Sequence, residues 1–178
     1  MAYITLTGAY SLNGNGRLNV GGSYTTSGTT TTYTQPSSTA GQTGDLGGFK
    51  SGSISFDASS VDNSTRGDGG WAINAPGVRS ATIELTWNKL ETDHAQDELV
   101  DMLTFAQADW QGKGIAVAYL SADTTGTNKS GFCGTFVPTA YSENQTGGGD
   151  NDATAVECSM TLVSYGPVCA ISDIAVPS

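Results

Sequence analysis

Residues 78–88 read Val-Arg-Ser-Ala-Thr-Ile-Glu-Leu-Thr-Trp-Asn, and this stretch decides the fold class. Apolar side chains occupy its odd-numbered positions from Ala81 to Trp87, and polar side chains occupy its even-numbered positions from Ser80 to Asn88. Successive side chains of a β-strand point to opposite faces of the sheet, so this two-residue period predicts a strand. One face of that strand is apolar and suited to a core, and the other face is polar.

A second amphipathic strand is predicted near the end of the chain, over Thr154–Tyr165. Its even-numbered residues from Val156 to Leu162 are apolar, and Glu157, Ser159 and Thr161 alternate with them. Gly-, Pro- and Asn-rich segments predict turns between strands. The remaining predicted elements are strands at Tyr3–Leu6, Ser53–Asp57, Ile115–Leu120 and Phe132–Tyr141, turns at Asn13–Gly16 and Pro76-Gly77, and a loop at Gly147–Asp152.

One helix is predicted over Asp93–Ala108, between two of the strands. Asp93 can cap its start, with Gln96 three residues later completing a pair that resembles a capping box. Apolar residues recur at helical spacing along one face, which predicts packing against a sheet. The predicted core between helix and sheet consists of Leu99, Met102, Leu103, Ala106, Ile83, Leu85, Val156, Met160 and Leu162.

These elements predict a single, mainly β domain over residues 1–178: an antiparallel β-sandwich or half-barrel with one packed α-helix. Two segments are predicted to be arms. Residues 21–48 contain mostly Gly, Thr, Ser and Gln, and so few apolar groups cannot offset the entropy lost on ordering. We expect this segment to be flexible in a free subunit or to order against another copy. Residues 167–178 form the second predicted arm, at the C-terminus.

Charge excludes two classes of function. The chain has 178 residues, with 7 Lys and Arg against 17 Asp and Glu, for a formal net charge of −10. A reader of nucleic acid, or a protein that docks on anionic lipid, needs a basic surface. Only 13% of the residues are charged, and a Thr-rich, weakly charged surface suits strands that pair with neighbouring copies.

No segment has the roughly 18 consecutive apolar residues of a membrane helix, so we expect no membrane association. The N-terminus lacks the basic start and the apolar stretch of a signal peptide, which predicts that the chain is made and kept in a cytoplasm. The three cysteines, Cys133, Cys158 and Cys169, are therefore expected to be reduced.

The motifs of common enzymes are absent from the sequence. His94 is the only histidine, which excludes metal sites that need two. Asp150-Asn151-Asp152 resembles the start of a calcium loop, but the required Gly and Glu do not follow. Arg66-Gly67-Asp68 spells an adhesion tripeptide that a Gly- and Asp-rich loop can produce by chance. We expect no catalytic activity, no metal and no cofactor.

From Phe56 to Pro167, about two thirds of the chain, the order of features resembles the major tail protein, or tail tube protein, of long-tailed bacteriophages. No single piece is diagnostic, but their order and spacing together are specific. The pieces are Ser55–Asp62 leading to Gly69-Gly70-Trp71, the strand that begins Pro76-Gly77-Val78-Arg79-Ser80, the acidic helix, and the strands Gly131–Phe136 and Glu157–Leu162.

The resemblance implies that six copies form a ring and that rings stack into the tail tube, through which DNA leaves the virion. Each subunit would give strands to one larger inner β-barrel, with the helix outside and a long loop reaching the adjacent ring. Its implied partners are other copies of the chain, the tail terminator, tail tip and tape-measure proteins, and double-stranded DNA that passes without tight binding. Its implied location is the virion tail, with assembly in the host cytoplasm. The candidate inter-ring residues are Thr29, Thr30, Thr31, Thr32 and Tyr33.

A channel for DNA fits simple geometry. Four strands from each of six subunits, spaced by about 4.8 Å and tilted by about 40°, make a cylinder about 48 Å across. Side chains remove about 10 Å, and a duplex about 20 Å wide still passes. An acidic wall offers few phosphate contacts, so the duplex can slide. The candidate lumen residues, on the polar faces of their strands, are Glu84, Glu157, Thr82, Thr86, Ser159 and Thr161.

Other interpretations remain open at this point. The same polar faces can meet ordinary solvent. The chain can be a ligand- or carbohydrate-binding β-sandwich, with Trp71, Trp87 and Trp110 as aromatic platforms. It can also be the tube protein of a related injection or secretion machine, which shares the assembly and differs in the cargo.

Overall fold

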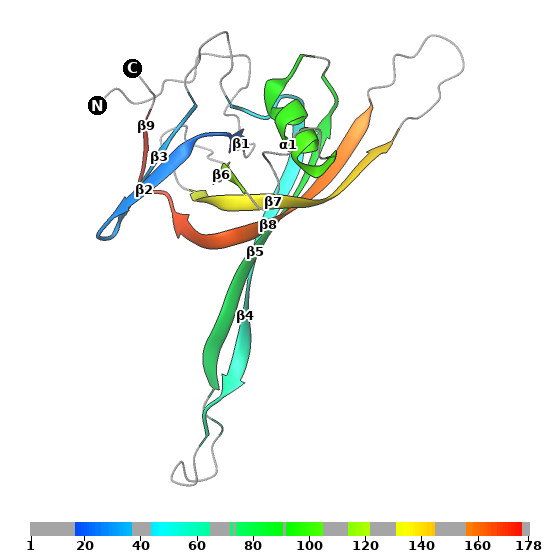
Figure 1. Cartoon of the computed structure of the whole chain (residues 1–178). Helices are drawn as coiled ribbons and strands as arrows, with labels where there is room; N and C mark the ends of the chain where they lie inside the picture. Colours follow the sequence, from blue (N-terminus) through cyan, green and yellow to red (C-terminus); the bar gives the residue numbers. More distant parts are fainter. Residues whose placement is uncertain are drawn as a thin grey trace.

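The computed structural model describes residues 17–36, 44–64, 72, 74–90, 92–104, 114–121, 131–144 and 156–175. Within these residues one helix accompanies strands that belong to two sheets (Figure 1). The elements are β1 (Arg17–Val20), β2 (Ser23–Ser27), β3 (Thr30–Thr34), β4 (Phe49–Asp62), β5 (Asn74–Asn88), α1 (His94–Thr104), β6 (Ile115–Leu120), β7 (Gly131–Asn144), β8 (Glu157–Ala170) and β9 (Asp173–Ala175).

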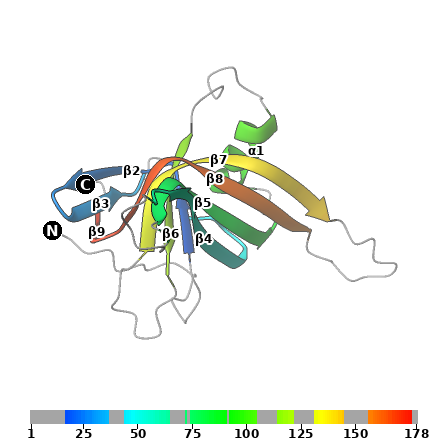
Figure 2. The same cartoon turned by 90° about the horizontal axis from the view of Figure 1, so that it is seen from below.

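The larger sheet has the strand order β1-β6-β7-β8-β5-β4, and every neighbouring pair is antiparallel. The smaller sheet has the order β2-β3-β9, with β3 and β9 parallel. It lies at one end of the long, curved strands β7 and β8, and the far tips of those strands lie at the other end (Figure 2). The mainly β, antiparallel fold with one helix is confirmed, and the strands of the described residues do not close into a barrel.

The two amphipathic strands predicted from the sequence are neighbours at the centre of the larger sheet. Ile83 lies opposite Leu162 and Leu85 lies opposite Met160, and all four side chains are buried. Residues opposite each other on antiparallel strands share a face, so the two apolar faces form one continuous surface. This surface is the floor of the main core.

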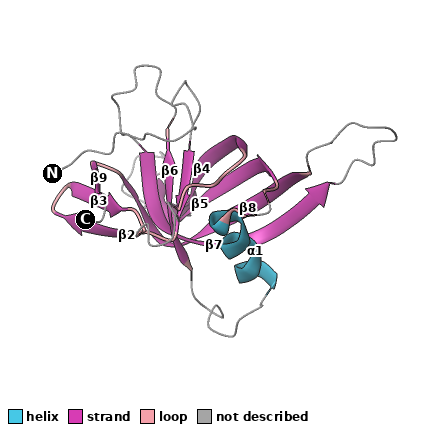
Figure 3. Ribbon diagram, turned by 90° about the horizontal axis from the view of Figure 1, so that it is seen from above, coloured by secondary structure: helices cyan, strands magenta, loops and turns pink. Residues whose placement is uncertain are grey.

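Helix α1 supplies the other side of that core and packs beside β7 (Figure 3). Leu99 and Met102 are buried in the same apolar cluster as the strand residues. Val156 is half-buried and packs against the cluster, Leu103 is half-buried, and Ala106 lies outside the described residues. In this part of the chain no helix has the length and apolar character needed to span a membrane.

The start of the helix is held to the sheet by two polar side chains. Asp93 caps the helix as predicted, because its Oδ1 accepts a hydrogen bond from the Gln96 backbone N–H at 3.0 Å. The Gln96 side chain differs from a capping box. Its Oε1 accepts from the Leu90 N–H at 3.0 Å, and its Nε2 donates to the carbonyls of Gly47 at 2.9 Å and Asn88 at 3.0 Å. Gln96 is 4% exposed, so it satisfies three backbone groups at a buried junction.

Strands β4 and β5 extend beyond the predicted boundaries, and the Pro76-Gly77 turn expected from the sequence lies inside β5. A register irregularity between Ala58 and Ser60 accompanies the proline. Proline has no N–H to donate to a ladder, so a strand tolerates it at an irregularity or at an edge. The C-terminal arm also differs, because β8 runs on to Ala170 and β9 follows it.

The Thr-rich segment expected to be an arm is partly ordered against its own chain. Strands β2 and β3 pair with each other, and β3 pairs with β9. Tyr33 is 1% exposed, and its hydroxyl donates to Asn19 Oδ1 at 2.8 Å and accepts from the Gly22 N–H at 3.2 Å. Burial raises the pKa of Tyr33 well above its usual range. The buried side chain of Tyr33 thus holds this segment against the fold, which the composition of the segment did not predict.

Several sequence predictions fall on residues that the structure does not describe. They are the strand Tyr3–Leu6, the turn Asn13–Gly16, the tripeptide Arg66-Gly67-Asp68, and the loop Gly147–Asp152.

Replacing Gln96 with Ala is expected to lower the free energy of unfolding by about 2–4 kcal/mol. The substitution leaves the Leu90 N–H and the Gly47 and Asn88 carbonyls without their partner at a buried site. Urea denaturation measures the loss, with Asp97→Ala on the exposed side of the same helix as the control. The control should change stability by less than about 0.5 kcal/mol. Equal stability of the two variants would contradict the assigned role of Gln96.

Candidate functional site

The candidate site is the face of β4, β5, β7 and β8 opposite the main core, which we call the polar face. Glu84 lies opposite Thr161 across β5 and β8, and opposite Ser53 across β5 and β4. Thr161 in turn lies opposite Ala140 on β7. The polar face consists of Ser51, Ser53, Ser55, Thr82, Glu84, Thr86, Ser142, Glu157, Ser159 and Thr161. All six residues predicted to line a lumen are therefore brought together on one surface.

Hydroxyl groups dominate the polar face and bond to each other across strands. The hydroxyl oxygens of Ser51 and Thr86 are 2.6 Å apart, and those of Ser142 and Ser159 are 2.7 Å apart. An open depression of about 530 Å³ lies on this face, with Glu84 and Thr86 among its lining residues. Hydroxyls that are paired in this way are partly satisfied within the sheet, so the surface stays polar while presenting few strong binding groups.

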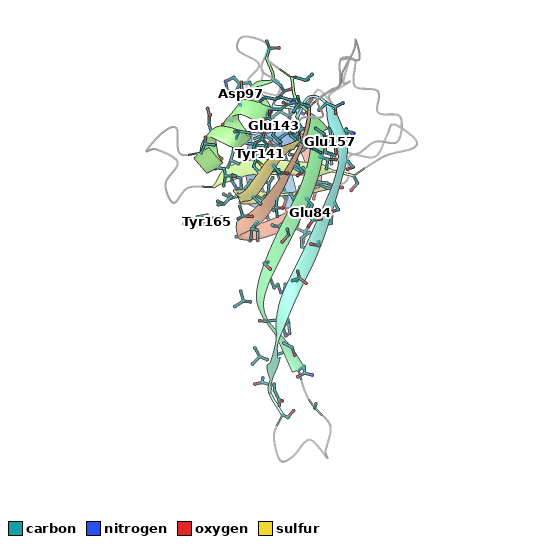
Figure 4. All side chains as sticks on the ribbon, turned by 90° about the vertical axis from the view of Figure 1, so that its right-hand side faces the viewer. Glu84, Asp97, Tyr141, Glu143, Glu157 and Tyr165 are labelled. Atoms are coloured by element: carbon teal, nitrogen blue, oxygen red, sulfur yellow. The ribbon has the colours of Figure 1, made fainter. Side chains whose placement is uncertain are left out.

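Charge on the polar face is sparse and mostly negative. Lys50 forms an ion pair with Glu157, and both side chains are about half exposed, at 45% and 48%. Glu84 is exposed, and among the described residues no cation pairs with it. Figure 4 shows Glu84 on β5, above the point where β4 and β5 leave the body of the molecule. One neutralised carboxylate and one unpaired carboxylate therefore face the same side.

A separate polar cluster joins the strands at the edge of the core. Lys89 Nζ donates to Glu143 Oε2 at 2.9 Å, and the Tyr141 hydroxyl donates to the same oxygen at 3.1 Å. The Tyr141 hydroxyl also lies 3.3 Å from Cys158 Sγ, and its ring stacks on Trp87 with 6.1 Å between centroids. Burial, followed by these hydrogen bonds, raises the pKa of Tyr141 well above its usual range. Tyr141 thus stays protonated and links β5, β7 and β8.

The predictions about His94 and about metal binding concern the side chains that commonly ligate metal ions. Among those residues no group of three His, Cys, Asp or Glu side chains is placed to hold a metal ion. His94 is exposed at the start of α1.

The predicted inter-ring residues Thr29, Thr30, Thr31, Thr32 and Tyr33 lie on β3 or in the turn before it. Thr31 and Tyr33 are buried at 3% and 1% exposure, so their side chains are not available for contact with another molecule in this conformation. Thr29 and Thr30 are exposed. Burial divides this candidate set because Tyr33 packs in a buried cluster with Ala118, Cys133 and Ile171, and its hydroxyl bonds to Asn19.

A different segment projects from the molecule, and sequence reasoning missed it. We call the paired segments Asp57–Asp62 and Asn74–Ser80 the ribbon. It extends away from the rest of the fold and has no third strand within the described residues (Figures 1 and 4). Val78 on it is 82% exposed and Val61 is 49% exposed. No alternation of polar and apolar residues marks this extension in the sequence, and the Pro76-Gly77 pair indicates a turn there instead.

The serines Ser51, Ser53, Ser55 and Ser142 of the polar face were not predicted as site residues, and neither was Lys50, which pairs with Glu157 there. Lys50 stands one residue after the start of β4, where a register shift separates Phe49 from Ser51. Its pairing with Glu157, on β8, follows from the strand order β8-β5-β4, which the sequence does not reveal.

These features define a class of fold: an open antiparallel sheet with a helix and a core on one face and a hydroxyl-rich surface on the other. Comparison with solved structures shows which known proteins share this fold. A chain of the SPP1 tail tube is similar with a TM-score of 0.58 and 14% identity, over 90% of this chain and 78% of that one. No protein-family model and no curated protein matches the sequence.

Two further solved structures have the same fold. One is a chain of the sheath/tube terminator of PVC, an extracellular contractile injection system, in its extended state. It has a TM-score of 0.56 and 15% identity, over 96% of this chain and 100% of that one. The other is a chain of the virion of a native gene transfer agent particle, with a TM-score of 0.53 and 22% identity, over 72% and 88% of the two chains. The chain thus has the tail tube fold, which confirms the resemblance seen in the sequence at the level of structure.

Replacing Lys50 with Ala should lower the free energy of unfolding by less than about 1 kcal/mol, because exposed ion pairs contribute little to stability. Ile83→Ala, on the opposite face of the same sheet, should cost about 2–5 kcal/mol. Urea denaturation of both variants measures the contrast. A loss above about 2 kcal/mol for Lys50→Ala would show that the pair supports the fold rather than setting the charge of the polar face.

Proposed function

We propose that this chain is the structural subunit of a tail tube, in which hexameric rings stack around a channel that double-stranded DNA passes through. The observation that carries the proposal is a four-stranded polar face with unpaired strand edges on both sides. The strands β7, β8, β5 and β4 form this patch in that order. A ring of such patches makes a continuous wall.

The first unpaired edge belongs to β4, the last strand of the larger sheet. Its Gly52 carbonyl accepts a hydrogen bond from the Tyr119 hydroxyl at 2.8 Å, which draws β6 toward β4 and curls the sheet. Beyond Gly52, the outer edge of β4 has no strand partner among the described residues. A long exposed edge readily pairs with another chain, so natural proteins cover it.

The second unpaired edge is the C-terminal half of β7. Strand β6 pairs with β7 only from Gly131 to Phe136. Residues 137–144 pair with β8 on one side, and the other side has no strand partner within the described chain. In a ring, the β4 edge of one copy pairs with this half of β7 in the next copy. The contact is heterologous, and six copies close it into one barrel.

The wall formed in this way is acidic and poor in binding groups. Six copies at −10 each carry a formal charge of −60. Lys50 is neutralised by Glu157, so the hydroxyls and Glu84 dominate the polar face. A surface that makes few cationic contacts to phosphate holds DNA weakly. We therefore assign the lumen to Glu84, Glu157, Thr82, Thr86, Ser159 and Thr161.

The ribbon replaces the Thr-rich segment as the main candidate for contact between rings. Seven residues of β5 in the ribbon span about 23 Å at about 3.3 Å each. A two-stranded ribbon is marginally stable alone in water, and exposed Val61 and Val78 gain by burial. A neighbouring ring offers that burial. Thr29 and Thr30, at the turn between β2 and β3, are exposed and remain available for a second contact between rings.

The proposed location is the virion tail after assembly in the host cytoplasm, and the proposed partners are the tail terminator, tail tip and tape-measure proteins. A second function, the tube of a contractile injection system, is favoured by the similarity to the PVC terminator chain. It shares the ring assembly and differs in the cargo. The charge of the channel wall distinguishes the two, because only a DNA conduit must avoid phosphate contacts.

Shortening the ribbon tests the assembly directly. Replacing residues 59–78 with Asn-Gly joins Ala58 to its register partner Arg79 through a two-residue hairpin turn. The full chain should form stacked tubes in negative-stain micrographs, and the shortened variant should form rings that do not stack. Its melting temperature should stay close to that of the full chain, since the ribbon lies outside the core.

Normal tubes from the shortened variant would remove the ribbon from the contact between rings. A full chain that stays a single subunit at all concentrations would overturn the tail tube proposal itself.

Charge reversal of Glu84 tests the channel. Tubes of Glu84→Lys should form and should retain short DNA duplexes in a sedimentation assay, because each ring gains six phosphate-binding cations. Retention should fall steeply as salt concentration rises. Glu84→Gln removes the charge without adding one, and Asp97→Lys makes the same reversal on the exposed side of α1. Neither control should retain DNA, and equal retention by Asp97→Lys and Glu84→Lys would contradict the lumen assignment.

A further inference from the structure

Two cysteines lie directly opposite each other beneath the smaller sheet. Cys133 on β7 is the register partner of Cys169 on β8. Both are free thiols; Cys133 is fully buried and Cys169 is partly exposed. The Thr26 hydroxyl, on β2, lies 4.0 Å from Cys169 Sγ, so the smaller sheet reaches over the pair.

The backbone geometry of this pair is compatible with a disulfide bond. Two residues away on the same strands, the Ile171 N–H donates to the Gly131 carbonyl at 2.9 Å. Pair types alternate along an antiparallel ladder, so Cys133 and Cys169 also form a hydrogen-bonded pair, with a typical Cα separation of about 5.5 Å. That separation falls within the window of about 4.4–6.8 Å for disulfides. The Cβ atoms of a hydrogen-bonded pair lie about 5.5 Å apart, which exceeds the range of about 3.5–4.5 Å typical of disulfides, so the strands must draw closer and the bond forms under strain.

The two thiols occupy different environments. Cys133 belongs to a buried cluster with Tyr33, Ala118 and Ile171. Burial, followed by the proximity of Cys169, raises the pKa of Cys133 to about 11. Cys169 is the thiol that solvent reaches first. An oxidant therefore reacts first with Cys169, and the buried Cys133 then reacts with the oxidised Cys169.

We propose that Cys133 and Cys169 form an oxidisable pair that a low-molecular-weight disulfide converts into a cross-strand disulfide bond between β7 and β8. The assignment is independent of the tube proposal, because it depends only on the register of two strands in one subunit. Cys158 takes no part in it. Its sulfur lies beside the Tyr141 hydroxyl near the opposite end of β8.

The reaction balances through two exchange steps. The Cys169 thiolate attacks one sulfur of the small disulfide, forms a mixed disulfide and releases one small thiolate. The Cys133 thiol loses its proton to solvent, and its thiolate attacks the Cys169 sulfur and releases the second small thiolate. The protein loses two protons and two electrons, and the small disulfide is reduced to two thiols.

The bond would fasten the end of β8 to β7 within the larger sheet, just before the chain continues into β9 of the smaller sheet. Beyond the register shift after Gly134, β8 pairs with β7 through only three residue pairs, with Cys133 and Cys169 in the middle. After these pairs the chain continues through Ile171 into β9, which is the third strand of the smaller sheet. Closing the loop between the cysteines restricts the opened state of this segment, so local opening becomes rarer.

Oxidised glutathione applied to the full, folded chain tests the proposal. After denaturation and alkylation, two of the three thiols should be protected, and the intact mass should fall by two hydrogen atoms with no glutathione retained. Peptide mapping should give one cross-link, between Cys133 and Cys169. Amide exchange in β9 and β3 should become about tenfold slower, and mild reductant should reverse it because the bond is strained.

Matched variants identify the order of steps. Cys133→Ser should retain one glutathione on Cys169, Cys169→Ser should remain unmodified, and Cys158→Ser should behave as the unaltered chain. The result for the unaltered chain decides the matter even where a variant fails to fold. Three alkylated thiols, glutathione retained on Cys169 of the unaltered chain, or a cross-link to Cys158 would each overturn the proposal.

Discussion

The fold depends on the pairing of β5 with β8. In that register every buried side chain of one strand lies opposite a buried side chain of the other, as Leu85 lies opposite Met160. The same pairing places Glu84 opposite Thr161 on the other face. A slip of one residue would move the apolar set into water and the carboxylate into the core, so burial specifies the register strongly. Core and polar face are two consequences of one constraint.

The sheet built on this pair is open within the described residues. Tyr119 bonds to β4 and curls the sheet, yet β4 and half of β7 keep edges without a strand partner in the described residues. Helix α1 is held close by Gln96 and covers the core side. Among the described residues no helix covers the polar side. In the proposed tail tube, neighbouring copies would pair with these edges.

The two ends of the molecule meet different physical demands. At one end the smaller sheet is anchored by Tyr33, whose buried hydroxyl is satisfied by Asn19 and Gly22. A buried polar group with its partners present specifies one arrangement, so a Thr-rich segment becomes ordered structure. At the other end the ribbon carries exposed Val61 and Val78 and has no core of its own. A two-stranded ribbon without a core is marginally stable, so a partner surface would stabilise it.

The sequence by itself determined the strands with clear alternation, the capped helix and the composition of the polar face. Period and spacing are local properties, so Ile83, Leu99 and Leu162 could be placed in the core, and Glu84 and Glu157 on polar faces, without coordinates. Only the tertiary structure decided what depends on contacts between distant segments. Pairing with β9 holds β3 in place, and Pro76-Gly77 lies inside a strand. Lys50 lies beside Glu157, and Cys133 lies opposite Cys169. Strand order and register bring these residues together, and no local pattern encodes them.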